Sequence, residues 1–250
     1  FFFKQKTAYE IKECDWSSDV CSSDLMDYVM KSLKNVDYMP WFLQEEPKTV
    51  NLIQAKFLNA ETVVFDKFEN QLGRCLTNYL LFDMEKGPWL AGNVVKKIYF
   101  YENINKSDWD IWCSSQIQYD EVCDKLKCLA ECQQSTTSIN ATTFELKIDD
   151  KPHLIQVIKR KFYNSVDELL LSFDFTICQF VTDGHRIKMG ETTLRDVKSK
   201  TIRLVSNEIR DTFLARLTKY IAYGYVPSAE LYERMTQPDA ITIWKANDGY

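Results

Sequence analysis

Leu90-Ala91-Gly92-Asn93 ends a short apolar run with a glycine, and Asp108-Trp109-Asp110 follows sixteen residues after that glycine. The apolar run predicts a strand, and Val94 to Phe100 predicts a helix that opens after the turn. A glycine between a strand and a helix lets backbone amides approach a phosphate, while the helix start favours negative charge. The segment therefore predicts a phosphate-binding turn at Gly92.

Two acidic residues stand two positions apart in the second stretch, Asp108 and Asp110. On a strand, this spacing places both carboxylates on one face. Mg²⁺ prefers carboxylates and substrate phosphates, and such ions can clamp the attacking and leaving oxygens of a phosphoryl displacement. A glycine turn, a helix and then two aspartates is the order that nucleotidyl transfer requires. The alternative is a pair of solvated strand acids.

The segments that follow carry a family resemblance. Ala91 to Lys96 resembles a glycine-pair motif, Asp174-Phe175-Thr176 matches a D-F-T motif, and Thr193 to Val205 resembles a G-L-x-D-L-x-x-K-x-I-R-x-V segment. With these segments placed before and after Asp108 and Asp110 in this order, the chain resembles the nucleotidyltransferase superfamily. Within it, the likeness is to the head domain of bacterial poly(A) polymerases and tRNA nucleotidyltransferases.

This resemblance implies an α+β fold, in which a nucleotidyltransferase-like mixed β-sheet has flanking helices and a C-terminal helical segment. It implies Mg²⁺ or Mn²⁺ on Asp108 and Asp110, which are both the catalytic and the metal-binding residues. The nucleotide-binding residues that it implies are Gly92, Asn93, Lys96, Asp174, Arg216 and Lys219. The expected partners are an NTP and an acceptor, which is an RNA end, a protein side chain or a small molecule.

Asp174 interrupts an otherwise apolar run from Leu171 to Ile177. An unpaired charge would be costly there. Its side chain either caps backbone amides at a corner of the chain or, as the resemblance implies, lies near the sugar or base of the nucleotide.

Several departures from the family pattern favour a second hypothesis. Asn93 replaces a small residue, Lys96 replaces an arginine, and Ser172-Phe173 replaces two basic residues. Gln156 stands where some branches of the superfamily have a third carboxylate, and Glu145 is a possible substitute. The 45 residues after Val205 are too few for the domains that grip tRNA, so addition of CCA in the usual manner is not expected. The alternative is a catalytically inactive nucleotidyltransferase-fold protein that binds nucleotide or a protein partner. An unrelated α+β interaction module is a third interpretation.

The first 25 residues resemble a translated sequencing adapter, with Lys4 to Ile11 and Asp15 to Leu25 as the two matching blocks. A signal peptide is the alternative, but Phe1 to Phe3 is too short for its apolar core. Met26 is the expected start of the protein. The predicted division is a non-native segment over 1–25, an N-terminal helical region over 26–86, a nucleotidyltransferase-like domain over 87–205 and a helical, neck-like segment over 206–250.

Periodicity and turn residues predict the remaining elements. Helices are expected from Val50 to Phe82, from Tyr119 to Cys132, after a capping box at Ser165, from Ile209 to Ile221 and from Ser228 onward. Extended segments are expected from Thr142 to Ile148, from Leu154 to Ile158, from Phe175 to Val181 and from Thr201 to Val205, with a loop from Ser135 to Ser138.

Composition narrows the class of protein. A net charge of −5 disfavours a protein that coats nucleic acid, and no run reaches the roughly 18 apolar residues of a membrane span. Without a secretory signal, the cysteines predict a reduced, cytoplasmic setting. Cys123, Cys128 and Cys132 have no zinc-knuckle spacing and fit one helix better.

One local basic cluster stands out, Lys159-Arg160-Lys161, followed by Phe162 and Tyr163. It fits either contact with a nucleic-acid backbone or the solvated end of a strand.

Overall fold

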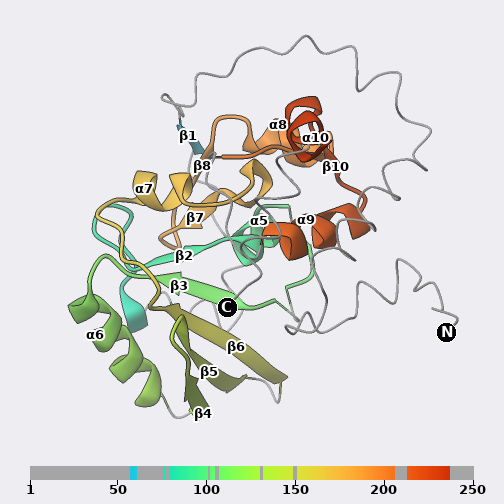
Figure 1. Ribbon diagram of the computed structural model, residues 1–250. Coiled ribbons are helices and arrows are strands. Elements are labelled where there is room, and N and C mark those ends of the chain that lie inside the picture. The colour runs from blue at the N-terminus through green and yellow to red at the C-terminus, as the bar shows by residue number, and fades with distance from the viewer. Residues whose placement is uncertain are drawn as a thin grey trace, which may run out of the picture. The chain divides into compact units, whose positions relative to one another are not determined.

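The structure is a computed structural model, and it describes residues 57–60, 76, 79–100, 102–104, 107–129, 132–148, 151–205 and 213–236 (Figure 1). These residues belong to two compact units. The sheet unit contains the described residues up to Phe173 and again from Cys178 to Thr193. The C-terminal unit contains Asp174–Ile177 and the described residues from Leu194 onward. The segment expected to be non-native, 1–25, and most of the predicted helical region over 26–86 lie outside the described residues.

The sheet unit is built on one mixed sheet, which confirms the predicted α+β class. Its strands are β1 (Phe57–Ala60), β2 (Trp89–Ala91), β3 (Trp109–Trp112), β4 (Cys132–Thr137), β5 (Ala141–Ile148), β6 (Lys151–Ile158), β7 (Phe180–Thr182) and β8 (Ile187–Gly190). They lie in the order β1-β8-β7-β2-β3-β6-β5-β4. The pair β3 and β6 is parallel, and the other neighbours in this order are antiparallel.

Three helices cover this sheet: α5 (Asn93–Tyr99), α6 (Gln116–Lys127) and α7 (Val166–Leu171), as Figure 1 shows. On one face, α7 packs with Trp89, Ala91 and Val181 in a buried cluster. Along each strand, every second residue points to the opposite face of the sheet. There Tyr99 of α5 contacts the Phe180 ring, with 6.0 Å between centroids, and Tyr119 of α6 bonds Thr142 of β5 at 2.6 Å.

Local side chains fix where two of these helices begin. The Ser165 hydroxyl accepts from the Glu168 amide at 3.2 Å, as the predicted capping box requires. The Glu168 carboxylate in turn accepts from the Asn164 amide at 3.0 Å. Ser115 caps α6 in the same way, accepting from the Gln118 amide at 3.2 Å.

The C-terminal unit contains α8 (Thr193–Lys198), whose first residue belongs to the sheet unit, β9 (Thr201–Ile202), α9 (Phe213–Ala222), β10 (Val226–Pro227) and α10 (Ala229–Thr236). The strands β9 and β10 are parallel. Phe175 is fully buried and packs against the rings of Phe213 and Tyr220, with centroids 5.4 and 5.8 Å away. The D-F-T segment therefore forms part of the core of this unit.

Two predicted elements are wrong because pairing between strands overrides local spacing. Phe57–Ala60, inside the helix predicted from Val50, is a strand that pairs with Ile187–Gly190. Ser135 to Thr137, predicted as a loop, belongs to β4, which pairs with β5 along the edge of the sheet. Helical spacing and polar composition are weak signals when a partner strand is available.

Two further boundaries also differ. The helix predicted to reach Cys132 ends at Lys127, and Cys132 instead begins β4. The strand predicted from Phe175 to Val181 is interrupted by a 3-10 turn over Thr176–Cys178, where the chain passes from one unit to the other, and β7 begins at Phe180.

Candidate functional site

A row of cross-strand neighbours defines the site. Ala91 of β2 pairs with Asp110 of β3, Asp110 with Gln156 of β6, and Gln156 with Thr143 of β5. Cross-strand neighbours share a face of the sheet, and we call this one the site face. Ala91 is buried beneath α7, whereas Asp110, Gln156 and Thr143 are half-buried. The site face thus opens to solvent from β3 outward.

Gly92 lies directly beside this opening. Its φ of 86° and ψ of −145° belong to a backbone region that is nearly restricted to glycine. A Cβ on this residue would stand 3.9 Å from Asp110 Oδ2 and 3.9 Å from Phe173 Cε1. The predicted glycine turn and the second aspartate are therefore neighbours.

The turn leads into α5 as the sequence predicts, and one backbone amide of the turn already forms a hydrogen bond within the sheet. The Gly92 amide donates to the Phe180 carbonyl at 2.8 Å, so it is held by the sheet. Asn93 begins α5 and is exposed, and the Lys96 amide donates to the Gly92 carbonyl at 3.2 Å. The side chain of Lys96 is buried on α5.

Asp108 immediately precedes the first residue of β3 and is exposed. Its neighbour Ser107 is buried, and Lys97 Nζ of α5 donates to Ser107 Oγ at 2.8 Å. This bond ties the segment before Asp108 to the helix after Gly92. Sequence reasoning missed Lys97 and Ser107, because nothing in their spacing indicates that they meet.

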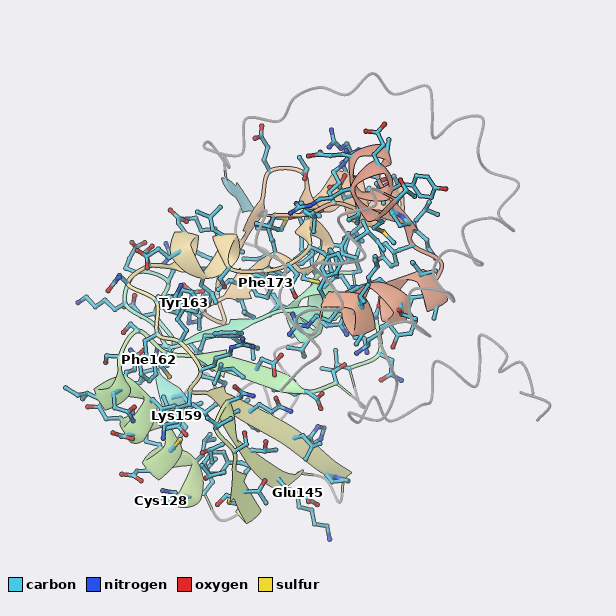
Figure 2. The ribbon with its side chains drawn as sticks, viewed as in Figure 1. Cys128, Glu145, Lys159, Phe162, Tyr163 and Phe173 are labelled. Carbon is cyan, nitrogen blue, oxygen red and sulfur yellow. The ribbon has the colours of Figure 1, made fainter. Side chains whose placement is uncertain are left out.

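Aromatic side chains continue the site face past Asp110. Trp112 lies two residues after Asp110, and its ring contacts those of Tyr163 and Phe173, with centroids 5.7 and 6.3 Å away. Trp112 and Phe173 are half-buried against the cluster under α7. Figure 2 shows Phe173 and Tyr163 on this side of the sheet unit. Trp112, two positions after Asp110, was the sequence signal for an aromatic side chain on the same face of the sheet.

A magnesium site here would draw on Asp110 of the site face and on Asp108, which directly precedes β3. Among the described residues, no group of three or more His, Cys, Asp or Glu side chains comes together to hold a metal. Glu145 therefore does not supply a third carboxylate, and the neighbour of Asp110 is the amide of Gln156. Mg²⁺ is commonly held by one or two carboxylates together with water and substrate phosphates, so two aspartates fit it.

Asp174 and Arg216 meet in the C-terminal unit. Asp174 is 6% exposed as a residue, and Arg216 Nη1 of α9 donates to its Oδ2 at 2.7 Å. Lys219 follows three positions later on α9 and is exposed. An arginine thus compensates the buried charge of Asp174, a partner that the sequence did not predict.

Comparisons with solved structures agree with this fold. A tRNA-processing enzyme in its apo form matches with a TM-score of 0.50 and 18% identity, over 74% of this chain and 49% of that one. A CCA-adding enzyme in apo form matches with a TM-score of 0.50 and 12% identity, over 72% and 44% of the two chains. A CCA-adding enzyme complexed with ATP matches with a TM-score of 0.50 and 14% identity, over 73% and 46%. The chain thus spans just under half the length of these structures.

The chain shares its fold with these CCA-adding and tRNA-processing enzymes, which agrees with the nucleotidyltransferase fold that the resemblance implied. The chain belongs to the Gabija anti-defense 2 family, whose sequence profile matches residues 62–200. No curated protein matches it. No described helix has the length and apolar character needed to cross a membrane.

Proposed function

We propose that this chain transfers a nucleotidyl group from an NTP to an acceptor, with Asp108 and Asp110 holding a divalent ion. The observation that carries the proposal is the position of Asp110, 3.9 Å from the Cβ site of Gly92 on an open face of a nucleotidyltransferase sheet. A glycine turn next to a carboxylate brings the triphosphate and its counter-ion to one place.

The residues of the chain have separate tasks in this reaction. Asp108 and Asp110 would hold Mg²⁺ or Mn²⁺, and the ion would neutralise charge on the triphosphate. Gly92 leaves the turn without a side chain, so that phosphate oxygens approach the backbone. The acceptor oxygen bonds to the α-phosphorus, the bond to the β-phosphate breaks, pyrophosphate leaves, and the acceptor proton passes to solvent. Asn93, Lys96, Asp174, Arg216 and Lys219 remain the proposed nucleotide-binding residues.

A second candidate is a fold that binds nucleotide or a protein partner without transfer. The observation that favours it is Gln156, a neutral side chain beside Asp110. A neutral neighbour contributes less to metal binding than a carboxylate would, which lowers affinity for the ion.

The family description names an action against Gabija defence. We place the transfer reaction in that setting, with an RNA end, a protein side chain or a small molecule as the acceptor. In cells protected by Gabija, wild-type chain should remove protection, and a chain with Asp110→Asn should not. Loss of protection with both forms would show that transfer is not the means.

Incubation with each labelled NTP, Mg²⁺ or Mn²⁺, and total cell RNA or protein tests the activity directly. Wild type should transfer label, and Asp108→Asn or Asp110→Asn should abolish transfer while leaving the fold intact. Asp120→Asn is the matched control, because Asp120 is an exposed acid on α6 that bonds Gln116 at 2.8 Å. Nucleotide binding without transfer in wild type would favour the second candidate.

A further inference from the structure

The basic cluster Lys159-Arg160-Lys161 follows directly from the site face. β6 is parallel to β3, so the end of β6 lies on the Trp112 side of Asp110. Gln156 is level with Asp110, and Lys159 stands three residues further on, which is about 10 Å at the rise of a strand. Figure 2 shows Lys159, Phe162 and Tyr163 following one another along this part of the sheet unit.

These three cations carry their charges at the surface. All three are exposed, and within the described part of the chain none of them forms an ion pair. Lys159 Nζ lies 5.9 Å from the centre of the Tyr119 ring, and Lys161 Nζ lies 5.2 Å from that of Tyr163. Packing over rings orients the two ammonium groups without neutralising them.

Aromatic rings connect this cluster to the acidic site. Tyr163, beneath Lys161, contacts Trp112, and Trp112 contacts Phe173, which borders Gly92. A continuous strip thus runs from the Gly92 turn beside Asp110, past the half-buried rings of Phe173 and Trp112 and the buried ring of Tyr163, to Lys161 and the two cations before it. Within that group, Lys159 packs over Tyr119 of α6, the helix on the other face of the sheet.

We propose that this strip docks a single-stranded nucleic acid, whose phosphates bind Lys159, Arg160 and Lys161. Single-strand sites combine a cationic track for the backbone with aromatic surfaces for bases, and both are present here. Three consecutive cations in a non-helical segment suit a ligand with closely repeated charges. Because the chain as a whole carries −5, attraction must come from this local cluster. That the bound nucleic acid serves as acceptor rests on the proposed function, whereas its binding to this strip does not.

Fluorescence anisotropy with a labelled oligonucleotide of about 12 nucleotides tests the docking in the absence of NTP and metal. Each phosphate contact on a single strand contributes about 0.7 to the slope of log affinity against log salt. Lys159→Gln with Lys161→Gln should therefore weaken binding and lower that slope by about 1.4. Adding Arg160→Gln should lower the slope by about 2 in total.

Lys125→Gln with Lys127→Gln is the matched control. It removes two positive charges, also two residues apart in sequence, from the C-terminal end of α6, about 9 and 12 Å along the helix from Tyr119 at 1.5 Å per residue. This control should leave the slope unchanged. Equal effects of the two pairs would overturn the proposal, as would equal binding of a poly-glutamate peptide, which would indicate an acidic protein partner. Oligonucleotide binding without any label transfer would contradict the proposed function and leave the docking surface standing.

Discussion

The ion pair between Asp174 and Arg216 tests whether an aspartate inside an apolar segment is stabilised by a partner within the protein. Asp174 is the aspartate of the D-F-T segment, and its side chain is only 4% exposed. Arg216 approaches it from α9 at 2.7 Å, but 49% of the arginine side chain remains exposed. Arg216→Met would leave a buried carboxylate without this partner.

Breaking a fully buried ion pair costs about 3–5 kcal/mol. Because half of the Arg216 side chain is in water, we expect about 2 kcal/mol for Arg216→Met. Asp174→Asn keeps an acceptor but loses charge, at about 1.5 kcal/mol. The double variant should cost about 2 kcal/mol rather than the sum, since removal of the arginine then leaves no buried charge behind, which gives a coupling of about 1.5 kcal/mol.

Urea and thermal unfolding of the full chain measure these changes, with about 4–8 °C expected for Arg216→Met. Arg195→Met is the control, because Asp196 keeps bonds from Thr176 and Arg203 at 2.8 and 3.2 Å when that arginine is removed. Additive effects of Asp174→Asn and Arg216→Met would refute the reasoning. A change in nucleotide affinity in Asp174→Asn and Arg216→Met that the control Arg195→Met does not share would support the nucleotide contact that the family resemblance implies.

Three further predictions concern the sheet unit. Gly92→Ala should lower the free energy of unfolding by about 2 kcal/mol, because φ of 86° strains any side-chain residue although the space itself is open; an unchanged Tm would contradict this. Lys97→Met should weaken Mn²⁺ binding in the presence of an NTP about fivefold, since Ser107 beside Asp108 loses its donor; calorimetric titration measures this, and equal affinity would remove Lys97 from the site. Burial raises the pKa of the Cys113 thiol to about 12, so iodoacetamide at pH 8 should label the exposed Cys128 and spare Cys113, and peptide mass mapping showing equal labelling would contradict that placement.

The local parts of the site were predictable because their signals are short. Gly92 ends an apolar run and begins a helix, and the two aspartates differ by two positions, so each inference used only neighbouring residues. The capping box at Ser165 and the two extended segments that form β5 and β6 were predicted for the same reason. Their geometry depends on the residue types themselves and little on the rest of the chain.

The remaining parts depend on partners far away in sequence. Arg216 lies 42 residues from Asp174, and Phe57–Ala60 becomes a strand through residues more than a hundred positions later. Ser135 to Thr137 has a polar composition typical of loops but pairs along β5. Hydrophobic spacing does not identify such partners, so the helix over Val50 to Phe82 was wrong where β1 formed.

In the proposed two-aspartate site, Gln156 would set how strongly the ion is held before substrate arrives. It is the direct neighbour of Asp110, one strand spacing or about 5 Å away. A carboxylate at that distance from a divalent ion would contribute about 1.7 kcal/mol even at the dielectric constant of water, so Gln156→Glu should tighten Mn²⁺ binding more than tenfold without nucleotide. Thr143→Glu places the same charge one strand further, at about 10 Å, where salt screens most of the attraction. Calorimetric titration of Mn²⁺ into both variants separates them. Equal affinities would mean that the ion does not bind beside Asp110, and the two-aspartate site would have to be abandoned.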